Sequence, residues 1–363
     1  MLTPVQDVVC VMLTRNRAAF AARSARALLG HSKVRLFVVD GSAPQHWSNL
    51  IAETDVLREE HAHLEVHHFG ERASASSRLM WALEESTEPL VWLMADDDLT
   101  LPDWHQLRSE VLGDPACVAA YGKTLRFGVG HRSFEPYGTL TAIYPQVPIP
   151  DPPWLEDDVL DDRLRSLGTR PLTSLGWYAL HRREALTEVL KCSLATRNPD
   201  NNLEYCMNIM QPVLGKVRAS SAVVLARQDN PVAKHLASRC SRRQYWSSRR
   251  EVLELIATHL ATHSGAPVDE ASEMLRIALQ PDASYCAQFS LTRLARIFGT
   301  RAQDFTARLS RWLHLHRYRS RGSLELTKRD PRLPEITPGD VRRSRRFVEN
   351  AVLQCGARGS LDG

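Results

Sequence analysis

The 363-residue sequence predicts an α/β fold, with a Rossmann-like, mostly parallel central sheet, helices on both faces of it, and a helical C-terminal region. Two observations carry this prediction. In the first hundred residues, short β-branched apolar runs alternate with Ala- and Leu-rich segments of helical period. Beyond about residue 241 the apolar spacing is helical throughout. We therefore expect two parts, a domain over residues 1–240 and a helical region over residues 241–363.

Four short apolar runs are the expected parallel strands, because each is apolar on both faces and ends at a polar or glycine-containing turn. They are Asp7–Thr14, Val34–Asp40, Leu64–Phe69 and Pro89–Ala95. Helices are expected around them over Asn16–Leu29, Ser74–Glu85 and Pro102–Leu112. This order implies right-handed β-α-β crossovers. Ligands of such sheets bind beyond the carboxyl ends of the strands, which points to the turns at residues 14–17, 40–42 and 96–98.

The later elements are less regular. Further strands are expected over Cys117–Phe127, Leu172–Leu180, Val213–Val217 and Ser221–Ala226, with a short helix over Asn201–Met210. Asp151–Asp162 holds six carboxylates and no basic residue, and we expect an exposed connection there. The C-terminal helices are expected over Arg242–His263, Val268–Leu279, Leu291–Ile297 and Ala302–Tyr318.

Composition excludes fibrous, disordered and membrane-spanning proteins. Hydrophobic residues are 43% and charged residues 24%, which are globular values, and no apolar run is long enough to span a bilayer. Seven cysteines without a CxxC pair, and no signal-peptide pattern, predict reduced thiols and a cytoplasmic protein. The net charge is +4, and the C-terminal tail is basic, most densely at Arg342–Arg346. Without interleaved aromatic residues, we expect no nucleic-acid partner.

The most informative motif is Asp96-Asp97-Asp98, directly after the strand that ends at Ala95. Adjacent buried carboxylates repel one another, so a cation would explain them. Mg²⁺ and Mn²⁺ prefer oxygen ligands, commonly one or two carboxylates together with substrate phosphates. In an extended segment Asp96 and Asp98 share one side, and one of the three acids could bind a ribose or sugar instead. The alternative is an acidic helix start before Pro102.

Three motifs in order resemble the GT-A glycosyltransferases, in particular the family-two-like group of inverting sugar transferases. VVCVMLTRNR (Val8–Arg17) is similar to that family's opening strand and turn, and VVDGSA (Val38–Ala43) to its second strand. MADDDL (Met94–Leu99) is similar to its DXD element. The resemblance implies a GT-A fold over roughly residues 5–230, a nucleotide-diphosphate sugar as donor, and Mn²⁺ or Mg²⁺ as cofactor.

The resemblance also implies roles for single residues. Asp40 and Thr14 would orient the nucleotide, with Asp96 and Asp97 also at the donor, and Arg17 or Arg78 would pair with the diphosphate; Ser77-Arg78 is the nearest match to the family's Arg-Asn pair. Asp98, assisted by Asp96, would hold the metal, with His235 as a third ligand. Within NPDNNLEYCMNIMQPVLGKV (Asn198–Val217), Glu204 is the favoured base for the acceptor hydroxyl and Asp200 the second choice.

We therefore expect a metal-dependent glycosyltransferase that moves a sugar, from UDP by preference, to a small-molecule or glycan acceptor with inversion. The negative charge that develops on the leaving diphosphate is what the metal would stabilise. The C-terminal helices from about residue 241 would shape the acceptor pocket or a dimer interface, so a homo-oligomer is compatible with the sequence. Two other readings stay open: a nucleotidyltransferase, although the Thr14–Arg17 turn lacks glycine, and a non-catalytic sugar-nucleotide-binding or scaffolding protein.

Overall fold

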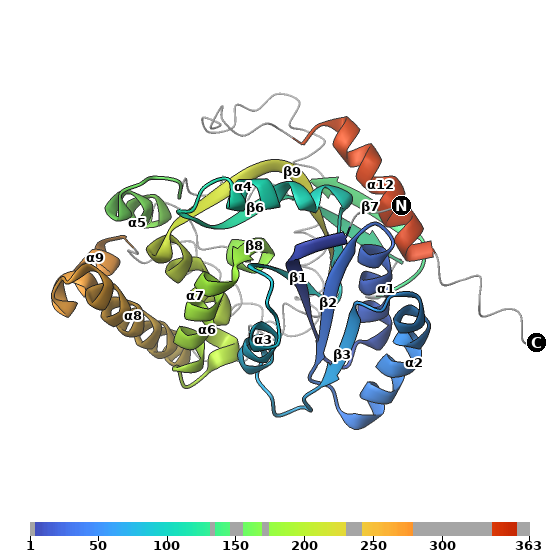
Figure 1. The fold of residues 1–363 in the computed structure, drawn as a ribbon, viewed down its shortest axis with the longest axis horizontal. Helices are drawn as coiled ribbons and strands as arrows, with labels where there is room; N and C mark the ends of the chain where they lie inside the picture. Colours follow the sequence, from blue (N-terminus) through green and yellow to red (C-terminus); the bar gives the residue numbers. More distant parts are fainter. Residues whose placement is uncertain are drawn as a thin grey trace, which may run out of the picture.

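Within the described residues, nine strands form one sheet, and helices cover both of its faces (Figure 1). The computed structural model describes residues 4–130, 135–145, 155–168, 174–229, 242–278 and 336–353. The strands are β1 (Pro4–Thr14), β2 (Lys33–Asp40), β3 (Leu64–His68), β4 (Leu90–Ala95), β5 (Leu99–Thr100), β6 (Cys117–Val129), β7 (Leu140–Pro145), β8 (Ala179–Arg182) and β9 (Lys216–Gln228). They lie in the order β3-β2-β1-β4-β8-β6-β9-β5, and β7 pairs with β6.

The four predicted N-terminal strands pair in parallel, as expected. Strand β1 lies between β2 and β4, and β3 lies outside β2. Thr14 is in register with Asp40 across β1 and β2, and Leu13 with Ala95 across β1 and β4. The three strands therefore end together, so the turns that follow them meet at one edge of the sheet.

Beyond β4 the sheet is mixed, which corrects the expectation of a mostly parallel one within the confirmed α/β fold. Strand β8 is antiparallel to both β4 and β6, and β5 is antiparallel to β9, whereas β6 and β9 are parallel. Strand direction leaves no mark in a short apolar run, because a strand buried on both faces is apolar whichever way it runs. Strand β9 is also one continuous strand where two were expected.

The helices close to their predicted positions are α1 (Ala18–Leu29), α3 (Ala75–Glu84), α4 (Gln106–Leu112), α8 (Arg242–Ser264) and α9 (Val268–Ala278). The others are α2 (Pro44–Glu60), α5 (Leu160–Gly168), α6 (Arg183–Leu194), α7 (Pro199–Leu214) and α12 (Pro338–Leu353), with 3-10 turns η1 (Pro102–His105) and η2 (Ser174–Tyr178). Helix α7 is longer than expected at both ends, and η2 takes part of a predicted strand. Among the described residues, no helix is long and apolar enough to cross a membrane.

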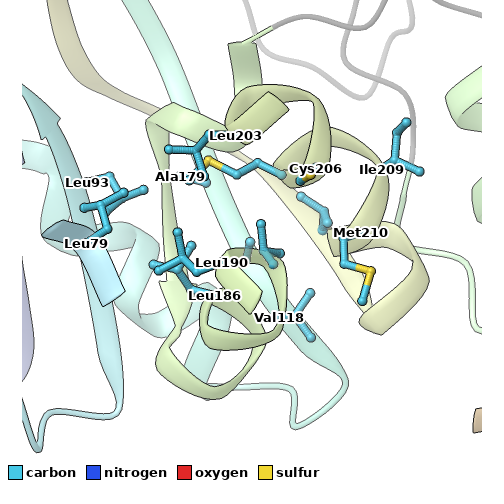
Figure 2. Close-up of a cluster of buried hydrophobic side chains, with 14 of the residues drawn as sticks. Leu79, Leu93, Val118, Ala179, Leu186, Leu190, Leu203, Cys206, Ile209 and Met210 are labelled. Atoms are coloured by element: carbon cyan, nitrogen blue, oxygen red, sulfur yellow. The ribbon is translucent and has the colours of Figure 1, made fainter. Parts of the chain in front are cut away.

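Alternate residues of β1 belong to different buried clusters, as the two-residue period of a strand requires. Val9 and Val11 pack with side chains of α3, α6 and α7, some of which Figure 2 shows. Val8 and Cys10 pack on the other face with side chains of α1, α2 and α4. The strand therefore has no exposed face, which fixes the position of its C-terminal end.

The described C-terminal helices pack against the first 240 residues at two separate places (Figure 1). Val252, Ile256 and Leu260 of α8 belong to the buried cluster around α7. Helix α12 lies over β7 and α1, where Val348 and Val352 are fully buried. The predicted helices at residues 291–297 and 302–318 lie outside the described residues, and a domain boundary near residue 240 stays a prediction.

Helix α7 is joined to the middle of the sheet by a buried histidine. His181 of β8 is 1% exposed, and its Nδ1 lies 2.8 Å from Nε2 of Gln211 in α7. Burial lowers the pKa of His181 from 6.5 to about 3. The imidazole is therefore neutral in the folded protein over the range where an unfolded chain would protonate it.

This difference predicts acid sensitivity. Between pH 3 and 6.5 the unfolded chain binds more protons at His181 than the folded protein, so its contribution to the free energy of unfolding falls as the pH drops below 6.5. The slope is at most about 1.4 kcal/mol per pH unit. Urea unfolding of His181→Gln at several pH values should show that slope reduced. The control is His105→Gln, at an exposed residue, which should keep the wild-type slope; equal slopes in wild type and His181→Gln would contradict the prediction.

Candidate functional site

The site lies where β1 and β4 end side by side. From β1 the chain proceeds outward to β2 and β3, and it then returns to β4 on the other side of β1. Ligands of open α/β sheets bind at such a switch point. The first residue after β4 and the last of β1 are joined there: the hydroxyl of Thr14 donates to Oδ2 of Asp96 at 2.9 Å, and both residues are buried.

Helix α1 holds the backbone of the Asp96–Asp98 turn. Oγ of Ser24 lies 2.8 Å from the carbonyl of Asp96 and 2.7 Å from that of Asp98. Nη2 of Arg23 donates to the carbonyl of Asp97 at 2.7 Å, while its Nη1 donates to Oε1 of Gln228 at 2.6 Å. The side chains of Arg23 and Ser24 are almost fully buried. These two residues of α1 therefore hold the backbone of the turn in place.

The three carboxylates have different partners. Nη1 of Arg17 lies 3.0 Å from Oδ1 of Asp96 and 3.0 Å from Oδ2 of Asp97. Oδ1 of Asp98 accepts the backbone N–H of Gln228 at 3.1 Å, and its Oδ2 lies 3.7 Å from Nε of Arg227, beyond hydrogen-bond distance. Arginines thus lie close to all three acids.

The nearby arginines nevertheless compensate the negative charges of Asp96 and Asp98 only in part. Burial, and next the charge of Asp97, raise the pKa of Asp96 to about 6 and that of Asp98 to about 7. Arg17 lowers the first and Arg227 the second, but both remain above the ordinary value of 3.8. A further positive charge at the turn would favour the ionised carboxylates.

Asp98 fits a divalent cation better than Asp96 does. Both oxygens of Asp96 accept hydrogen bonds, from Thr14 and Arg17, whereas Oδ2 of Asp98 has its nearest guanidinium nitrogen at 3.7 Å. No three His, Cys, Asp or Glu side chains gather as a metal cage in the described part of the chain. His235, the predicted third ligand, lies outside the described residues.

Asp40, at the end of β2, is fully buried with one oxygen unsatisfied. Its Oδ1 accepts the hydroxyl of Ser42, whereas Oδ2 has no hydrogen-bond partner and lies 3.7 Å from Nε2 of His68. The His68 ring stacks on Trp47 with ring centroids 4.8 Å apart. A buried carboxylate oxygen without a donor is costly, so a ligand N–H or O–H would stabilise it.

The turns after β1 and β2 are joined to each other. Asn16 has a positive φ of 58°, which Asn tolerates better than most residues. Its backbone N–H donates to Oγ of Ser42 at 2.7 Å, and its Oδ1 accepts the N–H of Ala43 at 3.1 Å. The two predicted nucleotide turns therefore form one unit.

Arg78, predicted as a diphosphate contact, bonds to the protein itself. Its Nη1 donates to the carbonyls of Thr14 at 2.9 Å and Val39 at 2.8 Å, which joins the ends of β1 and β2. A Cβ at Gly41 would lie only 2.8 Å from its guanidinium carbon, so glycine provides the space for this side chain. The geometry gives Arg78 a structural contact and leaves a diphosphate contact as a prediction.

The two predicted base residues lie on the exposed side of α7 but face different neighbours. Oδ1 of Asp200 accepts the backbone N–H of Ala75, at the start of α3, at 2.5 Å. Glu204, one helical turn later, lies within electrostatic reach of Arg227 and Tyr178, whose pKa values its charge raises. The charge of Glu204 therefore acts on Arg227 and Tyr178, whereas Asp200 bonds to the start of α3.

Sequence reasoning missed Arg23, Ser24 and Arg227. Arg23 and Ser24 sit in the middle of an amphipathic helix, where a polar residue reads as solvent-exposed. Arg227 follows a run of apolar residues near the end of β9, in the segment LARQDN, and this position was the only signal available.

Comparisons with known proteins give no family. No protein-family model and no curated protein matches the chain. Among solved structures, S. aureus TarS 1–349 in complex with UDP-GlcNAc is 12% identical, with 75% of this chain and 71% of that chain covered and a TM-score of 0.48. The mannosyltransferase PcManGT from Pyrobaculum calidifontis, in complex with GDP-Man and Mn²⁺, is 14% identical, with 84% and 86% covered and a TM-score of 0.38.

A longer S. aureus TarS structure is 12% identical, with a TM-score of 0.45. The match covers 75% of this chain but only 43% of the TarS chain. All of these identities are low, and a shared fold does not imply a shared substrate. The α/β arrangement that the GT-A resemblance implied is present in the strand order and helix layers described above. The chain has an α/β fold with a mixed central sheet.

The Ser24 hydroxyl offers a test of the turn. Ser24→Ala leaves two buried carbonyls without this donor, which should lower the free energy of unfolding by about 1–3 kcal/mol in urea denaturation. The control is Ser48→Ala, because the Ser48 hydroxyl makes an exposed bond to the carbonyl of Pro44 at 3.3 Å. Its effect should stay within about 0.5 kcal/mol. Equal effects of the two substitutions would show that α1 does not hold the turn.

Proposed function

We propose that the protein is a glycosyltransferase that moves a sugar from a nucleotide-diphosphate donor, UDP by preference, to a hydroxyl of a small-molecule or glycan acceptor, with inversion. One observation carries the proposal: the bond between Thr14 and Asp96 at the switch point of the sheet, with the other acids of the turn beside it. Buried acids at this place suit a substrate that brings cations or hydrogen-bond donors.

Asp40 and Thr14 would orient the nucleotide. The unsatisfied Oδ2 of Asp40 is an acceptor for one N–H of a base or one hydroxyl of a ribose. Because Oδ1 already accepts Ser42, this carboxylate suits a group that presents a single donor. Asp96 and Asp97, which are held by Arg17, would contact the donor next along the same edge.

Asp98 would hold the divalent cation, Mn²⁺ or Mg²⁺, with the donor's diphosphate completing its ligands. When bound, the cation supplies electrostatic stabilisation of the leaving diphosphate. Gln228 keeps the Asp98 carboxylate oriented through the bond to Oδ1, which leaves Oδ2 for this purpose.

Glu204 would be the general base. As the bond from the acceptor oxygen to the anomeric carbon forms, the bond from that carbon to the diphosphate breaks, and the hydroxyl proton passes to the Glu204 carboxylate. Its exposed position on α7 leaves it accessible to an acceptor, and its charge lies within electrostatic reach of Arg227. Asp200, which bonds to the start of α3, is the second candidate.

Calorimetry with UDP, with and without Mn²⁺, tests the donor and the metal. We expect UDP to bind more tightly with Mn²⁺, and Asp98→Asn to remove most of this enhancement, because an amide is neutral and a poorer ligand. Asparagine keeps an oxygen for the N–H of Gln228, so the fold should persist in circular dichroism. UDP binding that ignores Mn²⁺ in the wild type would instead favour the sugar-nucleotide-binding protein, and no UDP binding at all would overturn the proposal.

Glu204→Gln tests the base. The amide keeps the size of the side chain but cannot take a proton, so kcat for transfer should fall by about 10²–10⁴ while the dissociation constant for UDP is unchanged. Asp200→Asn is the matched comparison, and its main effect should be on thermal stability through α3. If Asp200→Asn lowers kcat more than Glu204→Gln does, the two roles are reversed.

A further inference from the structure

Arg227 lies between the acidic turn and the aromatic residue that ends η2. It is the second-last residue of β9, and its Nε is 3.7 Å from Oδ2 of Asp98. Its guanidinium carbon lies 4.1 Å from the centroid of the Tyr178 ring, a cation–π distance. The ring and the carboxylate therefore hold the guanidinium at the edge of the site.

This guanidinium is incompletely satisfied. Its Nε is buried and has no hydrogen-bond partner, and Asp98 is too distant to provide one. The side chain as a whole is 21% exposed, against 5% for the Asp98 side chain, so part of the group reaches the surface of the site. An arginine has five N–H donors in a planar fork that suits phosphate oxygens.

The two arginines expected at a diphosphate are already engaged elsewhere. Arg17 bridges Asp96 and Asp97, and Arg78 donates to two backbone carbonyls. Moving either one would uncover buried charges or carbonyls. Arg227 can turn toward an anion at less cost, because its contact with Asp98 is long and the stack on Tyr178 tolerates rotation of the guanidinium in its plane.

We propose that Arg227 binds the diphosphate of the nucleotide-sugar donor, on the Asp98 side of the site. This inference rests on the proposed function. Tyr178 acts as a positioning residue, because its ring keeps the guanidinium beside Asp98 in the absence of substrate.

As the sugar–diphosphate bond breaks, negative charge grows on the β-phosphate. Arg227 would donate to the phosphate oxygens on which this charge develops, so its contribution increases along the reaction. After departure of UDP, the guanidinium returns to Asp98 and partly compensates its charge.

The test compares the binding of UDP with that of uridine, both by calorimetry at a fixed Mn²⁺ concentration. Arg227→Ala should weaken UDP binding by about tenfold to a hundredfold, the range for hydrogen bonds to a charged group, and leave uridine binding unchanged. The UDP affinity of Arg227→Lys should lie between that of the wild type and that of Arg227→Ala, because lysine keeps the charge but not the planar stack.

The matched control is Arg126→Ala. The charge of Arg126 also reaches Asp98, but this arginine pairs with Asp229, so its removal tests the loss of a nearby charge without the loss of the site. The ratio of UDP to uridine affinity should stay at the wild-type value.

If Arg227→Ala keeps the wild-type ratio of UDP affinity to uridine affinity, the inference is overturned and the proposed function still stands. Equal weakening of UDP and uridine in Arg227→Ala also overturns it, because that result indicates a structural role. If the wild type binds neither compound, the proposed function has failed, and this inference with it. Circular dichroism of each variant shows whether the fold is retained, and Arg227→Lys carries the test if Arg227→Ala does not fold.

Discussion

The enclosure of three consecutive carboxylates at the end of β4 is the constraint on which the site depends. Burying like charges side by side is expensive unless positive groups and hydrogen-bond donors surround them. The chain meets this requirement with Arg17 and Arg23 from the region of α1 and Arg227 from the end of β9. Because these groups come from segments far apart in the sequence, the turn can form only when the sheet and α1 are already in place.

The same constraint divides the site into a part whose carboxylates are held on both sides and a part whose carboxylate can still change its partner. Asp96 and Asp97 are fixed by Arg17, and the backbone of the turn is fixed by Ser24. Asp98, in contrast, has one oxygen anchored by Gln228 and one with only a distant ion pair. A rigid edge beside one adaptable carboxylate suits a ligand that arrives with its own charges, because the protein has little left to rearrange when it binds.

Local patterns predicted the part of the fold that local physics determines. The four parallel strands, α1 and α3 follow from apolar period and turn residues, and the meeting of Thr14, Asp40 and Asp96 follows from parallel strands that end together. The reversed direction of β8 and the unbroken length of β9 depend on which strand each one meets, and no short window records that. For the same reason Arg23 and Arg227 could not be recognised. An arginine within a helix or at the end of a strand gains its role from a backbone carbonyl or a carboxylate more than seventy positions away.

Helix α12 has a consequence for how the molecule is made. Val348 and Val352 cover Leu125 and Phe127 of β6, and the carbonyl of Val352 accepts the N–H of Gly138 at 3.1 Å. More than two hundred residues separate these partners along the chain. During synthesis, α12 therefore cannot cover this apolar surface until residues 338–353 have left the ribosome, and nascent chains that stall earlier present it to chaperones or to one another.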